Sequence, residues 1–328
     1  MNKIFVVGPA WVGDMVMAQT LFMAIKEYDS SAVIDVLAPD WTRPLLERMP
    51  EVRYAHPMPI GHGPLAFKER YRIAQTLKSY DYTQAIVLPN SWKSALIPYF
   101  AKIPKRTGFR GECRYGLLND WRILNKKSLP RMIDRFAALA YHKDASFSQT
   151  VPFPRLEISQ PSVQAAVEKF SVQEDVKRPI LALCPGAEFG ASKRWPESHY
   201  SVVANAKLKE CWAVWLFGSK NDKAVAARIQ SETGERCIDF TGKTNLAEAI
   251  DLLSLSTLVL TNDSGLMHIA AALKRPLIAV YGSTDPGFTP PPPSTELEKT
   301  HQSEIEGSQS AAKKVFLKKL ESAEFLLD

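Results

Sequence analysis

Short apolar runs alternate with amphipathic helical stretches along most of the chain. In the first half, the expected strands are Lys3–Val7, Ala32–Leu37 and Gln84–Leu88, and the expected helices are Met15–Tyr28, Pro44–Met49 and Ala66–Tyr80. In the second half, the expected strands are Ile180–Cys184, Ala213–Phe217, Cys237–Phe240, Thr257–Leu260 and Leu277–Tyr281, and the expected helices are Glu197–Lys209, Lys223–Thr233, Leu246–Ser254 and Leu266–Leu273. Almost continuously apolar strands separated by helices predict α/β architecture, with parallel sheets covered by helices on both faces.

The alternation is interrupted between residues 143 and 178, which contain several prolines and a polar helical stretch near 162–175 but no strand-like run. This break predicts two Rossmann-like domains. We expect the first over residues 1–160, a connection over 161–178 and the second over 179–290. Residues 291–328 begin with a run of prolines and read as a polar linker followed by a C-terminal amphipathic helix over 311–327.

Composition places the chain among ordinary globular proteins. Of 328 residues, 45% are hydrophobic and 23% charged, and no apolar run reaches the ~18 residues of a membrane-spanning helix. The start of the chain lacks the pattern of a signal peptide, and the four cysteines form no C-x-x-C pair. We therefore expect a cytoplasmic protein with reduced thiols.

The formal net charge of +6 is a mild excess for this length. It favours anionic ligands or an anionic membrane surface, and it gives no reason to expect nucleic acid as a partner.

In open parallel sheets, ligands bind beyond the carboxyl ends of the strands. The segments that follow the expected strands are Gly8–Asp14, Pro89–Lys93, Pro185–Lys193, Gly218–Asp222, Thr241–Thr244, Asn262–His268 and Gly282–Thr284. Two such edges would form an interdomain cleft, where we place the site.

Asp14 ends the first of these segments. The spacing of Gly8 and Gly13 imitates a phosphate-binding P-loop, but Asp14-Met15 stands where that loop has Lys and Ser or Thr. An aspartate there would repel phosphate. Two interpretations of Asp14 stay open: a charge that stabilises a helix N-terminus, or a general base facing the cleft.

Two segments of the second half could bind an anion. Gly186 would let a ligand approach the backbone, and Lys193 lies beside the first amides of a helix. The small residues Asp263–Gly265, with His268 one turn later, could offer amides to phosphate oxygens. The alternatives are a solvated basic loop for the first segment and a helix-capping motif for the second.

The sequence contains no D-x-D, no H-E-x-x-H and no cluster of Cys and His. We therefore expect neither a metal site nor a cofactor.

Several motifs occur together and in order, and they carry a resemblance to a known family. They are Val12-Gly13-Asp14-Met15-Val16, Pro185-Gly186-Ala187 with Lys193-Arg194-Trp195-Pro196, Phe217-Gly218-Ser219, Thr261-Asn262-Asp263-Ser264-Gly265-Leu266-Met267-His268, and Tyr281-Gly282-Ser283-Thr284 with Thr289-Pro290-Pro291. Over residues 1–290 the chain resembles the heptosyltransferases of glycosyltransferase family 9.

The resemblance implies a GT-B fold, with two Rossmann-like domains facing each other across a cleft, acceptor in the first and donor in the second. It implies inverting, metal-independent transfer of heptose from ADP-heptose to the heptose of the lipopolysaccharide inner core. The implied catalytic residues are Asp14, as general base, and Lys193. The implied donor-binding residues are Gly186, Ser192, Lys193, Ser219, Asp222, Gly242, Lys243, Asp263, Ser264, Gly265 and His268. For the phosphorylated acceptor we expect Trp11, Asn90, Lys93, Arg106, Arg110 and Arg114.

Such an acceptor also implies peripheral contact with the cytoplasmic face of the inner membrane. Three alternatives remain: heptosyltransferase I or another family member with a different acceptor, a sugar-nucleotide epimerase of the same fold, and a non-catalytic nucleotide-binding protein.

Overall fold

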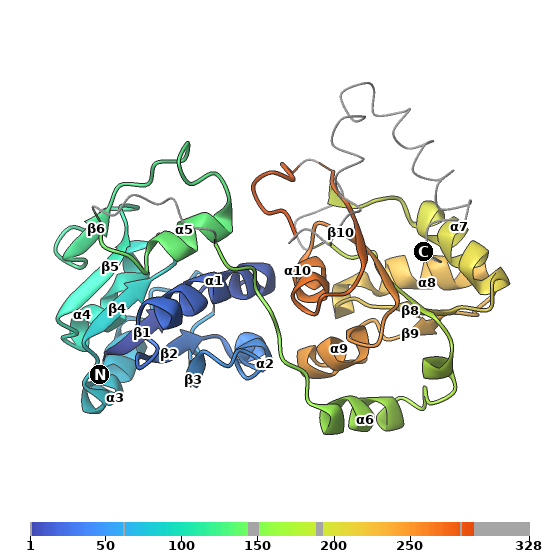
Figure 1. Ribbon diagram of the computed structural model, residues 1–328, viewed down its shortest axis with the longest axis horizontal. Helices are drawn as coiled ribbons and strands as arrows, with labels where there is room; N and C mark the ends of the chain where they lie inside the picture. The colour runs from blue at the N-terminus through green and yellow to red at the C-terminus, as the bar shows by residue number, and fades with distance from the viewer. Residues whose placement is uncertain (1, 62, 144–150, 188–192, 283, 292–328) are drawn as a thin grey trace. The chain divides into compact units, whose positions relative to one another are not determined.

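The computed structural model describes residues 2–61, 63–143, 151–187, 193–282 and 284–291 (Figure 1). The chain divides into two compact units. The first extends to Glu157 and includes Asp285–Pro290, and the second extends from Ile158 to Thr284. Ser192 and the linker and helix expected within 292–328 lie outside the described residues.

The first unit contains a six-stranded sheet in the order β3-β2-β1-β4-β5-β6, in which every neighbouring pair is parallel. Its strands are β1 (Lys3–Val7), β2 (Val33–Ala38), β3 (Val52–Pro57), β4 (Gln84–Val87), β5 (Lys105–Phe109) and β6 (Asp120–Arg122). Its helices are α1 (Val12–Tyr28), α2 (Arg43–Leu46), α3 (Phe67–Leu77), α4 (Leu96–Phe100) and α5 (Met132–Ala138), with 3-10 turns η1 (Asp40–Thr42), η2 (Lys78–Tyr80) and η3 (Trp92–Ala95).

Both faces of this sheet are covered, which explains its apolar strands. Alternate residues such as Phe5 and Val7 point to the face on which α3 and α4 pack. On the other face α1 packs against α5 (Figure 1). Because water reaches neither face at the centre, β1 and β4 have apolar residues on both sides.

The second unit contains a five-stranded parallel sheet in the order β11-β10-β7-β8-β9. Its strands are β7 (Ile180–Cys184), β8 (Ala213–Leu216), β9 (Ile238–Asp239), β10 (Leu258–Asn262) and β11 (Leu277–Val280). Its helices are α6 (Gln160–Lys169), α7 (Glu197–Lys209), α8 (Lys223–Thr233), α9 (Leu246–Leu253) and α10 (Gly265–Ala272), with 3-10 turns η4 (Asp175–Lys177) and η6 (Lys220–Asp222).

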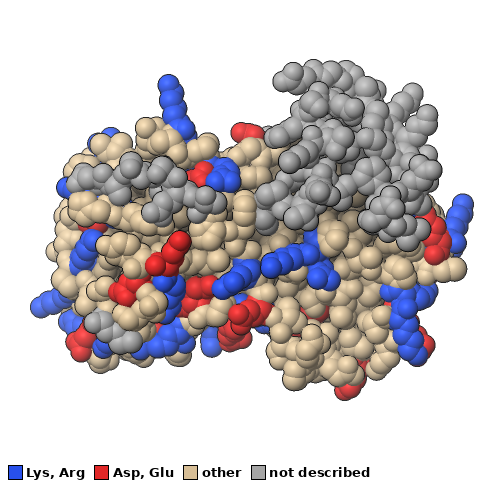
Figure 2. All heavy atoms as spheres, viewed as in Figure 1, with Lys and Arg blue, Asp and Glu red and all other residues tan. Residues whose placement is uncertain are grey.

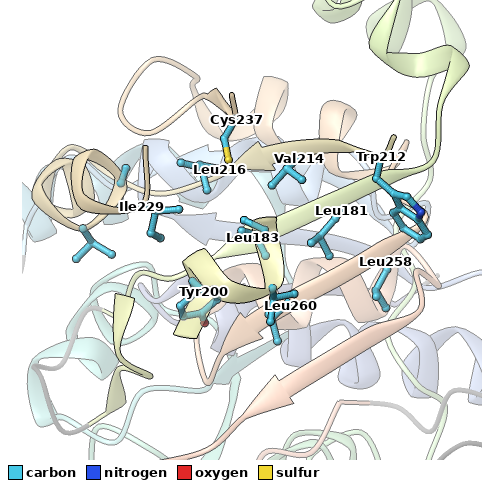
Figure 3. Packing of buried hydrophobic residues seen from close by; sticks show 14 of the residues in the cluster. Leu181, Leu183, Tyr200, Trp212, Val214, Leu216, Ile229, Cys237, Leu258 and Leu260 are labelled. Carbon is cyan, nitrogen blue, oxygen red and sulfur yellow. The ribbon is translucent and has the colours of Figure 1, made fainter. Parts of the chain in front are cut away.

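Figure 3 shows the core on one face of this second sheet. Leucine and valine side chains of β7, β8 and β10 meet Tyr200 from α7 and Ile229 from α8. Tyr200 is fully buried, so its hydroxyl needs a partner inside the protein. It finds one at the carboxyl edge of the sheet, as described below.

The α/β fold and most of the expected elements are confirmed. The strands β3, β5 and β6 were not predicted, because their sequences are too polar to stand out. In β3, for example, Arg53 and Tyr54 are exposed. These strands lie toward the two ends of the first sheet, where a strand has less apolar cover.

The expected second domain extended to residue 290, but Asp285–Pro290 belong to the first unit. The amide of Met132 donates to the carbonyl of Phe288 at 3.0 Å, and the guanidinium of Arg135 lies 4.5 Å from the centre of the Phe288 ring. The chain therefore returns to the first sheet's helical layer after β11.

None of the helices that the structure describes is both long and apolar enough to cross a bilayer. On the face that Figure 2 shows, basic and acidic side chains are interspersed.

A buried carboxylate organises the edge of the first sheet. Asp35 on β2 is fully buried and accepts a hydrogen bond from Tyr82 Oη at 2.5 Å and from Arg53 Nε at 2.9 Å. Tyr82 also lies 2.8 Å from His56 Nε2. Burial opposes the charge of Asp35, but the interactions with His56, Arg53 and Tyr82 outweigh it and hold its pKa at about 2.

We predict that Asp35→Asn lowers the free energy of unfolding by about 1–3 kcal/mol at neutral pH, because a charged hydrogen-bond acceptor is lost. The native pKa of Asp35 is depressed, so its contribution is present above the unfolded value of about 3.9. It disappears as the pH falls through about 2. Denaturant titrations of both proteins between pH 7 and 2 should therefore converge at acid pH. Asp40→Asn, at a carboxylate that is 67% exposed, is the matched control. A pH-independent difference would contradict this account.

Candidate active site

Each sheet has one point where the strand order reverses, and there the loops on either side diverge. In the first unit the reversal lies between β1 and β4, and in the second between β7 and β10. Parallel α/β sheets bind ligands at the carboxyl ends of the strands at such points. The segments after these four strands are therefore the natural places to look for a site.

The reversal point of the first sheet carries a pocket of about 360 Å³, within the range of small-molecule sites. Its lining comes from the segments after β1 and β4, from α5 and from the residues after β2 and β3, among others. The residues that line it are Val7, Gly8, Pro9, Ala10, Trp11, Asp14, Leu37, Pro39, Trp41, Met58, Ile60, Gly61, Arg70, Leu88, Pro89, Asn90, Ser91, Lys93, Ser94, Phe109, Leu124, Met132, Arg135, Phe136 and Leu139.

Asp14 is the one acidic side chain among the residues that line this pocket. It lies in the first turn of α1, whose N-cap position is occupied by Trp11. Asp14 is therefore not the N-cap residue, although its charge still lies at the favourable end of the helix. Burial raises the pKa of Asp14 above the ordinary aspartate value. A carboxylate in a pocket with a raised pKa suits proton abstraction.

Basic and aromatic side chains surround Asp14 in the pocket lining. Lys93 Nζ donates to the carbonyl of Gly63 at 2.9 Å, and Arg135 Nε donates to the carbonyl of Leu129 at 3.0 Å. These carbonyls orient the two cations without neutralising them. Trp11 and Trp41 are 39% and 50% exposed, so both leave aromatic surface for a ligand.

The expected acceptor residues Trp11, Asn90 and Lys93 line the pocket, whereas Arg106, Arg110 and Arg114 do not. Arg114 is buried and donates to the carbonyl of Pro89 at 2.7 Å. Arg106 donates to the carbonyls of Leu117 and Ile103, each at 2.7 Å. Both guanidinium groups thus fix the loops beside the pocket. Arg110 is exposed.

In the second unit, Lys193 and Asp263 meet at the reversal point. Lys193 Nζ lies 3.0 Å from Asp263 Oδ2, which also accepts from the hydroxyl of Thr284 at 2.7 Å. The side chains of Lys193 and Asp263 are 21% and 9% exposed. Segments after β7, β10 and β11 therefore share one charged, largely buried cluster.

Asn262, the last residue of β10, is the polar centre of this edge and is fully buried. Its Oδ1 accepts from the amide of Trp195 and from the hydroxyl of Tyr200, each at 3.0 Å. Its Nδ2 donates to the carbonyl of Pro185 at 2.7 Å. One amide thus connects the turn after β7, the Lys193 loop and α7.

Asp222 organises the neighbouring loop after β8. Its Oδ2 accepts from the amide and the hydroxyl of Ser219, at 2.8 and 2.7 Å, and Arg194 lies 3.6 Å from its Oδ1. A Cβ atom on Gly186 would lie 2.6 Å from this carboxylate. Gly186 is therefore needed for close packing of the two loops, in addition to any role in ligand approach.

The remaining expected donor residues lie at the same sheet edge. Ser264 is the N-cap of α10, but its side chain makes no capping hydrogen bond, and Gly265 begins the helix. His268 is buried, and burial lowers its pKa to about 4, so it is neutral at physiological pH. Gly242 adopts a left-handed φ of 66° after β9, and the exposed Lys243 lies 3.6 Å from Asp239.

The described ranges hold no group of three or more His, Cys, Asp and Glu side chains placed to bind a metal ion.

Sequence reasoning missed four residues of these two edges: Trp41, Arg70, Arg135 and Asn262. Trp41 lies in the segment that follows β2. Because ligands bind beyond the carboxyl ends of parallel strands, the position of Trp41 is the signal that could have indicated it. Asn262 stood inside a quoted motif without a role. Arg135 lies on α5, a helix that was not predicted, and no local signal marks it.

Comparison with known proteins gives consistent matches. The model of glycosyltransferase family 9 (heptosyltransferase) matches residues 70–320. Lipopolysaccharide heptosyltransferase 2 of Salmonella typhimurium is 48% identical over 298 residues, covering 88% of this chain and 85% of that protein. Lipooligosaccharide heptosyltransferase 2 of Haemophilus influenzae is 49% identical, with 88% and 86% covered.

Among solved structures, ADP-heptose lps heptosyltransferase II of E. coli superposes with a TM-score of 0.82 at 45% identity, covering 88% of this chain and 87% of that one. The family 9 glycosyltransferase of Veillonella parvula gives a TM-score of 0.80 at 17% identity, which supports the fold alone. These matches confirm the GT-B fold class expected from the motifs. With its family model covering most of the sequence and relatives near 48% identity, the chain belongs to glycosyltransferase family 9, the heptosyltransferases.

Proposed function

We propose that this enzyme transfers L-glycero-D-manno-heptose from ADP-heptose to the heptose of the lipopolysaccharide inner core. The observation that carries the proposal is Asp14, the single carboxylate in a pocket otherwise lined by basic, aromatic, apolar and neutral polar side chains. Relatives at 47–49% identity are named heptosyltransferase 2, which favours this acceptor over that of heptosyltransferase I.

In the proposed reaction, Asp14 accepts the proton of an acceptor hydroxyl as its oxygen attacks the anomeric carbon of the donor heptose. The new bond forms as the bond from that carbon to the phosphate oxygen breaks, and ADP leaves. A single displacement inverts the anomeric configuration. The raised pKa of Asp14 makes it a stronger base than an exposed aspartate.

We assign the donor to the reversal point of the second sheet. Lys193 supplies positive charge for the diphosphate, and the first amides of α10, from Gly265 onward, are hydrogen-bond donors. Asp263 orients Lys193 before ADP-heptose binds, so the ammonium group is already in place. Its position beside the leaving phosphate stabilises the charge that develops there.

We assign the phosphorylated acceptor to the pocket of the first unit. Lys93 and Arg135 are cations held by backbone carbonyls, and they suit its anionic groups. Trp11 and Asn90 lie in the segments that follow β1 and β4, where the acceptor sugar would rest. Because this acceptor is a lipid, we further propose that the enzyme works in the cytoplasm, on the inner face of the membrane.

The direct test is incubation of the protein with ADP-heptose, with and without core lipid that ends in heptose, followed by mass spectrometry. The proposal requires ADP release and a heptose added to the lipid only when the lipid is present. Conversion of ADP-heptose without acceptor would indicate an epimerase. Binding of ADP-heptose without any product would indicate a non-catalytic nucleotide-binding protein.

We predict that Asp14→Asn lowers kcat by about 10²-fold or more, the contribution typical of a general base, while ADP affinity stays the same. The acidic limb of the pH–rate profile should also disappear.

Because the native pKa of Asp14 is raised, its ionisation destabilises the fold as pH rises through that value. Asp14→Asn should therefore unfold at the same or a higher temperature at pH 7. Normal turnover in the variant, or a lowered melting temperature, would indicate that Asp14 stabilises the start of α1 rather than acting as the base.

We predict that Lys193→Ala weakens ADP binding by roughly 1.5–3 kcal/mol, the scale of a charge-assisted hydrogen bond. Calorimetric titration of ADP measures this change directly. Binding of a soluble core oligosaccharide should be unaffected. Lys177→Ala, which removes a lysine that is 66% exposed elsewhere in the second unit, is the control. Wild-type ADP affinity in Lys193→Ala would refute the donor assignment.

We predict that Asn262→Leu weakens ADP binding and lowers the free energy of unfolding by about 2–4 kcal/mol, because several buried groups lose their partner at once. Tyr200→Phe removes only one of these hydrogen bonds, so it should cost about 1 kcal/mol and leave ADP binding almost unchanged. Urea titration and calorimetry on both variants provide the comparison. Equal effects of the two substitutions would show that Asn262 does not position the donor loop.

A further inference from the structure

The outer side of α3 and α4 exposes large apolar side chains that the proposed reaction does not use. Phe67 and Tyr71 on α3 are 50% and 49% exposed, and Tyr99 on α4 is 44% exposed. Leu65 and Trp92, which flank these helices in the sequence, are 41% and 40% exposed. We call these five residues the aromatic patch.

Helical spacing explains how α3 presents this surface. Phe67 and Tyr71 are four residues apart and share one stripe of the helix. Ala74 follows Phe67 by seven residues and lies on the same side of the helix, but it packs into the core together with Leu77. The two exposed rings therefore extend the apolar face of α3 beyond the part that packs into the core.

Three members of the patch, Phe67, Tyr71 and Tyr99, form one continuous surface. The ring of Phe100 lies 5.1 Å from that of Phe67, 5.6 Å from that of Tyr71 and 5.7 Å from that of Tyr99. One half-buried ring thus joins the exposed side chains of both helices. Contiguous exposed apolar surface marks an interaction site, whereas single exposed residues do not.

The patch adjoins residues that line the pocket in the same unit. Lys93, which lines the pocket, directly follows Trp92 and donates to the carbonyl of Gly63. Arg70, another lining residue, donates to the carbonyl of Leu65 at 2.7 Å. A molecule resting on the patch would therefore lie close to residues that line the proposed acceptor pocket.

Charge around the patch is predominantly positive. Residues 64–112 contain nine Lys and Arg against three Asp and Glu, although the whole chain has an excess of only +6. One of the three, Glu112, accepts from the backbone amide of Trp92 at 3.0 Å. Glu69 is paired with Arg72, and the guanidinium of Arg106 lies over the Tyr99 ring. Lys68 and Lys102 are exposed beside the aromatic residues.

We infer that the aromatic patch docks the enzyme on a bilayer that contains anionic phospholipids. Tyr and Trp side chains prefer the boundary between lipid and water, and nearby lysines are attracted by acidic headgroups. This inference rests on the proposed function, since a lipid-anchored acceptor requires the pocket mouth to reach the membrane surface.

The first experiment measures binding to vesicles and needs no reaction. Wild-type protein should partition onto vesicles of phosphatidylcholine with 30% phosphatidylglycerol. Binding should be weaker on phosphatidylcholine alone and at high salt.

Phe67→Ser/Tyr71→Ser should reduce partitioning by about tenfold or more, since two half-exposed rings lose their apolar contact with lipid. Lys68→Gln/Lys102→Gln should reduce it by roughly tenfold, at ~1 kcal/mol for each basic residue near the surface. Tyr28→Ser, at a tyrosine that is 79% exposed on α1, should leave it unchanged.

The second experiment compares acceptors. With core lipid embedded in the same vesicles, kcat/KM of Phe67→Ser/Tyr71→Ser should fall in step with partitioning, and with a soluble core oligosaccharide it should equal the wild-type value. If wild type transfers heptose to neither acceptor, the proposed function fails, while the vesicle measurement still decides the docking surface.

Wild-type partitioning in both patch variants would overturn the inference, as would equal binding to neutral and anionic vesicles. Loss of a wild-type dimer in light scattering, without any vesicle binding, would assign the patch to a second copy of this chain instead. Should the double serine variant not fold, Tyr99→Ser and the lysine variant carry the same test.

Discussion

The buried amide of Asn262 is the contact on which the second unit's site depends. It satisfies an amide, a hydroxyl and a carbonyl from three segments that are distant in sequence. Without it, burying these groups would be costly, and the loop that carries Lys193 would lose one of the contacts that hold it. Asp263 directly follows Asn262, and Lys193 lies two residues before Trp195, so the same amide holds the backbone close to both members of the Lys193–Asp263 pair. The chemistry proposed for this edge therefore depends on a residue that need not touch the donor.

The same architectural rule governs both units, but it positions different chemistry in each. In the first unit, the reversal between β1 and β4 opens a pocket with one carboxylate and several cations. In the second, the reversal between β7 and β10 brings a lysine and an aspartate together beside a helix start. A base belongs with the acceptor hydroxyl, and a cation belongs with the leaving diphosphate. In the proposed reaction, the two edges thus divide the tasks of a glycosyl transfer between them.

The sequence was most informative where burial on both faces made a strand continuously apolar. Ile180–Cys184 was predicted with its observed bounds, as were the helices Glu197–Lys209 and Lys223–Thr233. The local pattern could not reveal β5, which begins with the polar residues Lys105 and Arg106. A segment of five residues does not show that it will pair with β4. For the same reason, the sequence could not show that Arg114 is buried and donates to the carbonyl of Pro89. Nor could it show that Arg135, from a helix later in the chain, lines the pocket. Motifs indicated the segments of the candidate site, and tertiary contacts determined which cations line the pocket.

We propose that the donor binds the edge of the second sheet and the acceptor binds the pocket of the first. Amide hydrogen exchange of the whole protein, with ADP alone and with a soluble core oligosaccharide alone, distinguishes the two sites. ADP should slow exchange in residues 193–195 and 262–268 and leave exchange in residues 8–14 and 88–94 unchanged. The oligosaccharide should produce the opposite pattern. Protection of residues 8–14 by ADP, or of residues 262–268 by the oligosaccharide, would contradict this proposal.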